Sequence, residues 1–310
     1  MRQGAVRKMK KGSFTKQLPF LLMTLPGLLY LLINNYVPMF GIVIAFKDID
    51  FAKGILGSEW VGLENFKFLF RTNDAFVMTR NTICYNLVFI LLGTAFSVAV
   101  AIMLNELISQ RGKKIYQTVI LLPQLISIII VAYIVYAFLN PESGMVNGLL
   151  SAMGLEEISW YSEKKYWPFI LTFVNLWKSV GYSSIVYLAA ISGIDQSIYE
   201  AAKVDGAGRF RQIFQLTIPL LKPTIIVLIL MSVGRIMYSD FGLFYQVTMN
   251  SGALYEYTNT IDTYIYRALL QLNDISMSSA ASVYQSLVGF VLIMAVNMIV
   301  KKIDQENALF

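Results

Sequence analysis

The stretch N-T-I-C-Y-N-L-V-F-I-L-L-G-T-A-F-S-V-A-V-A-I-M-L-N, from Asn81 to Asn105, runs for 25 residues without a charged side chain. A helix needs about 20 mostly apolar residues to cross the roughly 30 Å of hydrocarbon in a bilayer. Strands of a membrane barrel would instead alternate in hydrophobicity over about ten residues. The continuous run of Leu, Ile, Val and Phe therefore favours a membrane-spanning helix.

Comparable stretches lie on both sides of this one. The six predicted spans cover about 18–46, 82–105, 116–139, 168–191, 223–245 and 277–300. The basic side chains within them are Lys178 and Arg235. The sequence thus predicts an all-α integral membrane protein, with one transmembrane domain over residues 17–300 between a basic segment (1–16) and a tail (301–310).

The composition excludes several classes of protein. Of the 310 residues, 56% are hydrophobic and 14% are charged, whereas about a quarter of the residues of a water-soluble domain are charged. A soluble enzyme, a disordered protein and a nucleic-acid-binding protein are therefore not expected. Because the chain has one cysteine, Cys84, and no histidine, it offers no disulfide framework, no Ser-His or Cys-His nucleophile and no histidine-based zinc site. We expect neither a catalytic nor a metal site.

The basic residues predict the orientation of the spans. With the N-terminus inside, the inner segments hold 15 Lys and Arg against 6 Asp and Glu, and the outer segments hold 8 against 13. Basic loops stay on the cytoplasmic side, so both termini are predicted to be cytoplasmic. The basic N-terminal stretch superficially resembles a signal peptide, but its hydrophobic run is too long and no small-residue cleavage site ends it. We expect an uncleaved first span, anchored by lysines beside anionic lipid.

The inner segment 192–222 is the most informative part of the chain. It contains S-I-Y-E-A-A-K-V-D-G-A-G-R-F-R-Q-I-F-Q-L-T-I-P, from Ser197 to Pro219. The pattern predicts a short helix over 197–205, capped by Ser197, and a second helix over 209–216. Gly206 and Gly208 permit a bend between the two helices. Pro219 and Pro223 are expected to mark the entry into the fifth span.

This segment resembles the E-A-A loop of the membrane subunits of binding-protein-dependent ABC importers. Glu200, Ala201, Ala202 and Gly206 match that motif at the right spacing, and Pro219 stands where its final proline falls. The stretch Leu216-Thr217-Ile218-Pro219 departs from the motif by exchanging I and L. The stretches W-V-G-L-E-N-F (60–66) and I-D-T-Y-I-Y-R (261–267) further resemble permeases that take large oligosaccharides.

The resemblance implies a type I ABC importer permease in a bacterial cytoplasmic membrane. It also implies a complex with a similar second permease subunit, two ATPase subunits carrying ATP and Mg, and an extracytoplasmic sugar-binding protein. The chain has no G-x-x-x-x-G-K-[ST] phosphate loop, so ATP must be hydrolysed by another polypeptide. The residues implied to couple this chain to the ATPases are Tyr199, Glu200, Ala201, Ala202, Asp205, Gly206 and Pro219.

Two cations within the predicted spans suggest a substrate pathway, because intramembrane charges usually face a cavity or a partner. Helical spacing places Asn175, Lys178 and Tyr182 on one face, and Ser232, Arg235 and Ser239 on another. If both cations face one passage, an anionic oligosaccharide is favoured, with Trp177 and Tyr238 available to stack on sugar rings. Alternatively, both cations bond to helix carbonyls or to carboxylates of a partner subunit. The further polar positions Asn86, Gly93, Ser97, Gln124 and Ser127 are expected to serve helix packing.

Two other functions remain as alternatives. A secondary carrier commonly places carboxylates within its spans, whereas the acids here lie in loops or near span ends. An integral-membrane enzyme acting on sugars or lipid-linked sugars needs a cluster of acids, histidines or metal ligands at the membrane surface, and the acidic pair Asp48 with Asp50 is more economically explained as the polar end of the first span. The importer interpretation accounts for more of the chain than either alternative.

Overall fold

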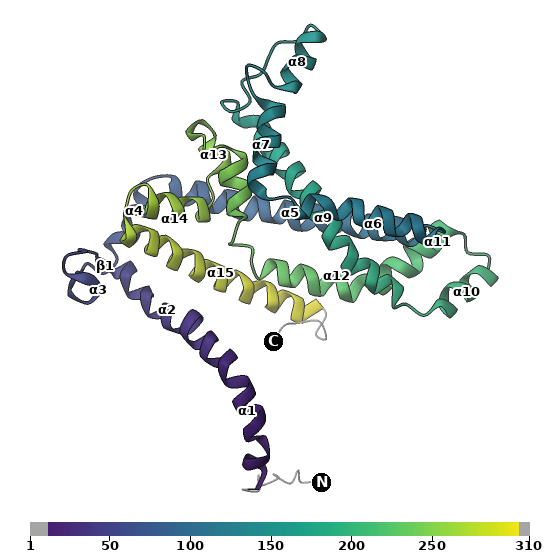
Figure 1. Ribbon diagram of the computed structural model, residues 1–310, viewed down its shortest axis with the longest axis horizontal. Coiled ribbons are helices and arrows are strands. Elements are labelled where there is room, and N and C mark those ends of the chain that lie inside the picture. Colours follow the sequence, from purple (N-terminus) through teal and green to yellow (C-terminus); the bar gives the residue numbers. More distant parts are fainter. Residues whose placement is uncertain (1–11, 304–310) are drawn as a thin grey trace.

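The computed structural model describes residues 12–303, and these residues form an elongated helical bundle with one small two-stranded sheet (Figure 1). The parts of the predicted basic segment and tail at 1–11 and 304–310 lie outside the described residues. Five described helices are long and apolar enough to cross a membrane, and a bent pair makes a sixth candidate. The all-α class and the predicted number of spans are confirmed.

The N-terminal part of the described chain begins with a long, exposed helix that diverges from the bundle (Figure 1). The apolar stretch Leu18–Phe46 is continuous, although its hydrogen-bonding pattern changes along its length. β1 and β2 pair antiparallel, with Lys47 opposite Trp60. The elements of this N-terminal part are α1 (Gly12–Leu31), η1 (Leu32–Tyr36), α2 (Val37–Met39), η2 (Phe40–Phe46), β1 (Lys47–Asp48), α3 (Gly54–Gly57), β2 (Glu59–Trp60) and α4 (Glu64–Arg71).

The bundle itself is built mainly from long helices that run alongside one another (Figure 1). Its elements are α5 (Asp74–Asn105), α6 (Gln110–Leu125), α7 (Ile128–Leu139), α8 (Met145–Ala152), η3 (Lys164–Tyr166), α9 (Trp167–Ser192), α10 (Gln196–Val204), α11 (Arg209–Gln212), η4 (Ile213–Thr217), α12 (Ile218–Val233), η5 (Leu243–Val247), η6 (Gly252–Leu254), α13 (Tyr255–Thr258), α14 (Ile261–Leu270) and α15 (Ile275–Ile303).

Helix α5 passes through three buried apolar clusters and so joins the bundle together. Met78 packs with residues of α14 and α15, Tyr85 packs with residues of α7, α9 and η5, and Ala101 packs with residues of α9 and α12. Helices α6 and α9 approach very closely at Gly181, where a Cβ atom would lie 1.8 Å from the carbonyl oxygen of Ile120. This contact requires glycine.

The third predicted span is not one straight helix. Helices α6 and α7 meet at a bend of 90°, and the backbone is extended at Ile126 and Ser127. Pro123, near the end of α6, lacks the N–H that an uninterrupted helix would use. Residues 116–139 are free of charge throughout, so the criterion that predicts a span does not reveal this break. As a result α7 and α8 project away from the bundle (Figure 1).

The fifth predicted span is displaced along the sequence. One helix continues from Arg209 to Val233 through Pro219 and Pro223, so the surface helix predicted over 209–216 is the first part of the span. The helix ends at Val233 rather than near residue 245, and residues 234–240 are irregular. Ser232, Arg235 and Ser239 therefore do not share a helix face, and that prediction was wrong.

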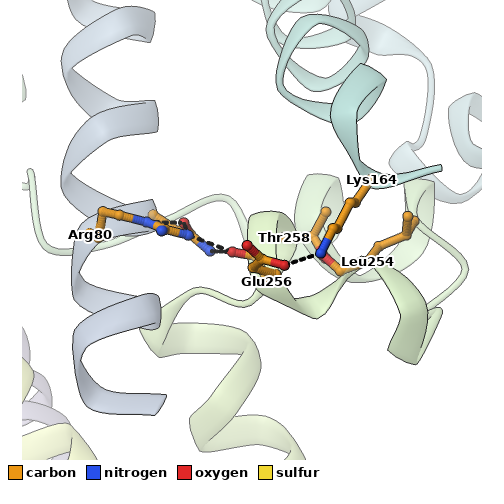
Figure 2. Close-up of polar contacts among 6 residues, drawn as sticks. Arg80, Lys164, Leu254, Glu256 and Thr258 are labelled. Atoms are coloured by element: carbon orange, nitrogen blue, oxygen red, sulfur yellow. Dashed lines mark hydrogen bonds and ion pairs between the residues drawn. The ribbon is translucent and has the colours of Figure 1, made fainter. Parts of the chain in front are cut away.

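Charged and polar contacts fasten one end of the bundle (Figure 2). The Arg80 guanidinium donates to the side chain of Asn81 and, at 2.6 Å, to the main-chain oxygen of Glu256. The ammonium group of Lys164 forms an ion pair with the Glu256 carboxylate. Glu256 thus ties α13 both to α5 and to the turn that precedes α9 (Figure 2).

Candidate functional site

Helix α10 stands clear of the bundle at one of its ends (Figure 1). Asp195, and not Ser197, caps this helix, because its carboxylate accepts a hydrogen bond of 2.9 Å from the Ser197 N–H. This hydrogen bond holds the pKa of Asp195 below its ordinary value. Serine and aspartate both cap helices well, so the sequence alone does not decide between Ser197 and Asp195.

The bend after α10 lies at Gly206, as the sequence predicts. Gly206 has a φ angle of +76°, and the Ala207 N–H donates back to the carbonyl oxygen of Ala202 at 2.9 Å. This arrangement ends a helix where a residue without a Cβ atom is favoured. Glu200, Ala201 and Asp205 are exposed, whereas Ala202 is half-buried. Helix α10 therefore presents a small, partly acidic surface.

Two polar contacts join α10 and its turn to the helix that follows. Tyr199 and Thr217 share a hydrogen bond of 3.0 Å between their hydroxyl groups, and the Gln212 side chain donates to the Ala207 carbonyl at 2.7 Å. Of these residues, Tyr199 is predicted from the sequence to be a coupling residue, whereas Thr217 and Gln212 are not. Both of these are buried polar residues. The surrounding stretch, R-F-R-Q-I-F-Q-L-T (209–217), contains several other polar residues, so the sequence offers no signal that distinguishes these two.

A cavity of about 510 Å³ lies between α5, α9 and the end of α12. Hydroxyl and amide groups predominate among its polar side chains, and Arg235 and Asp240 are its charged residues. The lining residues are Asn86, Phe89, Ile90, Gly93, Thr94, Ser97, Asn175, Ser179, Tyr182, Ser183, Val186, Tyr187, Leu228, Met231, Ser232, Arg235 and Asp240. Such a surface is suited to a ligand that carries many hydroxyl groups.

The structure brings together four of the predicted pathway residues, which are Asn175, Tyr182, Ser232 and Arg235. Asn86, Gly93 and Ser97, which were expected to serve packing, also line the cavity. Asn86 and Ser97 serve both purposes, because each also bonds to a main-chain oxygen across the bundle. A polar residue that faces a cavity and a neighbouring helix at once cannot be assigned to one role from spacing alone.

Four other residues that were predicted to line the pathway or to stack on the sugar lie outside the cavity lining. The ammonium group of Lys178 donates to the carbonyl oxygens of Pro123, Gln124 and Ile126, at 3.4, 3.2 and 2.6 Å, and so holds the bend between α6 and α7. Ser239 bonds to Asp262. Tyr238 is exposed beside the cavity, and Trp177 lines a separate apolar groove.

Arg235 differs from Lys178 in its surroundings. Its side chain is exposed at the cavity, and among residues 12–303 its guanidinium has no ion-pair partner. Asp240 lines the same cavity, where its carboxylate accepts the Leu243 N–H at 3.0 Å. Arg235 is thus the cation available to a ligand. Within the described residues no cluster of three or more acids or cysteines is arranged to hold a metal ion.

Comparison with known proteins supplies the context for this geometry. Residues 93–305 match the family described as "Binding-protein-dependent transport system inner membrane component". The chain is 36% identical over 286 residues, 92% of its length, to the polygalacturonan/rhamnogalacturonan transport system permease protein YteP of Bacillus subtilis, and the match covers 88% of that protein.

Two solved structures share the fold over almost the whole chain. Both come from a bacterial ABC transporter for alginate, described for one as importing this acidic polysaccharide. At 33% identity the match to that one covers 94% of this chain and 98% of the other, with a TM-score of 0.85. The second structure, with a TM-score of 0.84, is in complex with an alginate pentasaccharide-bound periplasmic protein. The chain therefore belongs to the family of binding-protein-dependent transport system inner membrane components, as a permease subunit of a sugar ABC importer and not an enzyme.

Proposed function

We propose that this chain forms one half of the import pathway for an acidic oligosaccharide, and that separate ATPase subunits drive it through α10. The observation that carries the proposal is the cavity that Arg235 shares with many hydroxyl and amide side chains. A guanidinium without an ion-pair partner favours a carboxylate, while the neutral groups suit the hydroxyls of a sugar. YteP and the alginate transporter, whose names refer to pectic and acidic polysaccharides, support this choice of substrate.

The proposed complex contains a second permease, two ATPase subunits with ATP and Mg, and an extracytoplasmic sugar-binding protein. The complex lies in the bacterial cytoplasmic membrane, with both termini of this chain inside. The distribution of Lys and Arg supports the orientation. The periplasmic protein bound to the similar alginate transporter supports the last partner.

Helix α10 is proposed as the ATPase-docking element, comprising Tyr199, Glu200, Ala201 and Ala202, with Asp205 and Gly206 in the turn and Pro219 further along. Its exposed position and small side chains permit close approach of a partner, and Glu200 can pair with a basic group there. The hydrogen bond from Tyr199 to Thr217 gives α10 a direct connection to α12. A movement of α10 would therefore reach the cavity wall.

Replacing Arg235 by alanine tests the substrate. We expect the apparent KM for an oligogalacturonate of four to six units to rise about tenfold or more, because loss of a hydrogen bond to a charged group costs roughly 1.5–3 kcal/mol. Transport of a neutral oligosaccharide such as maltotetraose, if measurable, should change little. Uptake is measured in proteoliposomes that contain the assembled complex and its binding protein. Equal losses for both sugars would contradict an acidic substrate.

Replacing Glu200 by lysine tests the docking role of α10. The charge reversal should reduce the amount of ATPase that co-purifies with the permease, and should abolish most uptake, because like charges would face each other at the contact. Insertion into the membrane should be unchanged. The matched control is Glu156→Lys, which reverses an exposed charge on the segment predicted to face outward. Normal co-purification and uptake with Glu200→Lys would refute the docking role.

A further inference from the structure

The irregular segment 234–240, directly after α12, is held in place by side chains from three other elements. The amide group of Asn86 on α5 donates to the main-chain oxygens of Ile236 and Tyr238, at 2.8 and 3.0 Å. Gln285 on α15 donates to the oxygen between them, that of Met237, at 2.7 Å. Three consecutive carbonyl groups that a continuing helix would have satisfied are thus bonded by two side-chain amides.

The N–H side of the same segment is held by an acid. The Asp262 carboxylate, at the start of α14, accepts the Ser239 N–H at 2.7 Å and the Ser239 hydroxyl at 2.8 Å. Its other oxygen accepts the Gln285 side chain at 3.2 Å. Gln285 and Asp262 therefore brace each other as well as the segment. Gln285 is 3% exposed, so this contact is enclosed in protein.

Physical chemistry explains why such bracing is needed here. Irregular backbone at membrane depth is tolerated only where it is buried in protein or lines a cavity, because lipid cannot satisfy its polar groups. Ile236 and Met237 are buried in the cluster that contains residues of α5, α14 and α15, whereas the preceding residue, Arg235, is exposed at the cavity. The buried pair and its bonded carbonyls fix the direction in which Arg235 leaves the backbone.

We propose that Gln285 and Asp262 are positioning residues for substrate selection, which act by holding Arg235 at the cavity wall. Neither residue lines the cavity, so neither is expected to touch the sugar. The inference rests on the proposed role of Arg235 toward an acidic oligosaccharide. It also explains the position of Arg235. Side chains distant in sequence, and not α12 itself, stabilise the break after α12.

A double-mutant cycle between Gln285 and Arg235 tests the inference. Gln285→Met keeps the length and bulk of the side chain but removes its donor. We expect it to raise the apparent KM for the oligogalacturonate about fivefold, with kcat and the apparent KM for the neutral sugar within twofold of the parent complex. If Gln285 acts through Arg235, adding Gln285→Met to Arg235→Ala should raise the KM no further, because residues that act as a unit are not additive.

The controls separate this inference from the proposed function. Ser286→Ala lies beside Gln285 on α15 and removes a hydroxyl that bonds within its own helix, so it should leave every constant unchanged. If Gln285→Met does not assemble, the same cycle is run with Asp262→Asn, which retains an acceptor for Ser239. An additive cycle, or an equal effect on both sugars, would overturn the positioning role while leaving Arg235 selective. If Arg235→Ala itself shows no selectivity, the acidic substrate is wrong and the positioning role falls with it.

Discussion

Replacing Gly181 by alanine is expected to prevent α6 from packing on α9, and to reduce the yield of folded permease about tenfold or more. The added Cβ atom would lie 1.8 Å from the Ile120 carbonyl oxygen and 2.6 Å from its carbonyl carbon. Real Cβ atoms do not approach main-chain atoms this closely, so one helix must move. Overpacking of a well-packed interior typically costs about 1–3 kcal/mol. Because the clash here is with main-chain atoms, which cannot rotate away, we expect a loss of stability of about 3 kcal/mol or more.

Detergent-solubilised protein measured by fluorescence-detected size-exclusion chromatography would show this loss as a smaller monodisperse peak. Gly148→Ala is the matched control, because Gly148 also lies in a helix and no atom would lie within 4 Å of its added Cβ. That variant should fold as well as the parent, since alanine favours helix over glycine. A parent-like yield and thermal midpoint for Gly181→Ala would show that α6 and α9 can separate at little cost.

Replacing Lys178 by methionine is expected to have the second largest effect, and to act on stability rather than on substrate choice. Methionine retains an unbranched side chain as far as the ε position but lacks the ammonium group that bonds to three carbonyl oxygens at the bend between α6 and α7. Each buried polar group left without a partner costs about 1–3 kcal/mol. A drop of several degrees in the thermal midpoint of the purified permease should therefore follow.

The same variant distinguishes the two intramembrane cations. Because the Lys178 ammonium is occupied by carbonyl groups, Lys178→Met should lower uptake of acidic and neutral oligosaccharides by the same factor, whereas Arg235→Ala should discriminate between them. Lys178→Arg, which retains the charge and the donors, should recover most of the thermal stability. A selective loss of acidic sugar uptake in Lys178→Met, at unchanged stability, would place Lys178 in the pathway after all.

The sequence sufficed for the spans and for α10, because both depend on local patterns. Freedom from charge over 20 or more residues is sufficient to identify a spanning helix, and Gly206 in a left-handed conformation ends α10 where the motif predicts. The two broken spans could not be predicted in the same way. Their breaks are stabilised by Lys178, Asn86 and Gln285, each of which lies far in sequence from the carbonyl groups it satisfies.

The candidate site, too, could be predicted only where its residues lie on a regular helix. Asn175 and Tyr182 were identified because α9 is regular there, and helical spacing correctly places them on one face. Spacing failed for Ser239, because the helix assumed to carry it ends at Val233. It also failed for Lys178, whose long side chain reaches a neighbouring helix instead of the cavity on its own face. A period of 3.6 residues predicts the direction of a Cβ atom, but not the end point of a flexible side chain.

The uninterrupted helix from Arg209 to Val233 can transmit a movement from α10 to the cavity. Its 25 residues span about 37 Å, with Thr217 near one end and Ser232 at the other. Since Tyr199 is bonded to Thr217, a movement of α10 acts on the end of this helix that lies farther from the cavity. A tilt of about 10° about a point near Thr217 would displace the far end, about 24 Å away, by roughly 4 Å, a little less than the rise of one helical turn. The movement would then reach the segment that begins at Gly234, where Asn86, Gln285 and Asp262 hold the backbone against α5, α14 and α15.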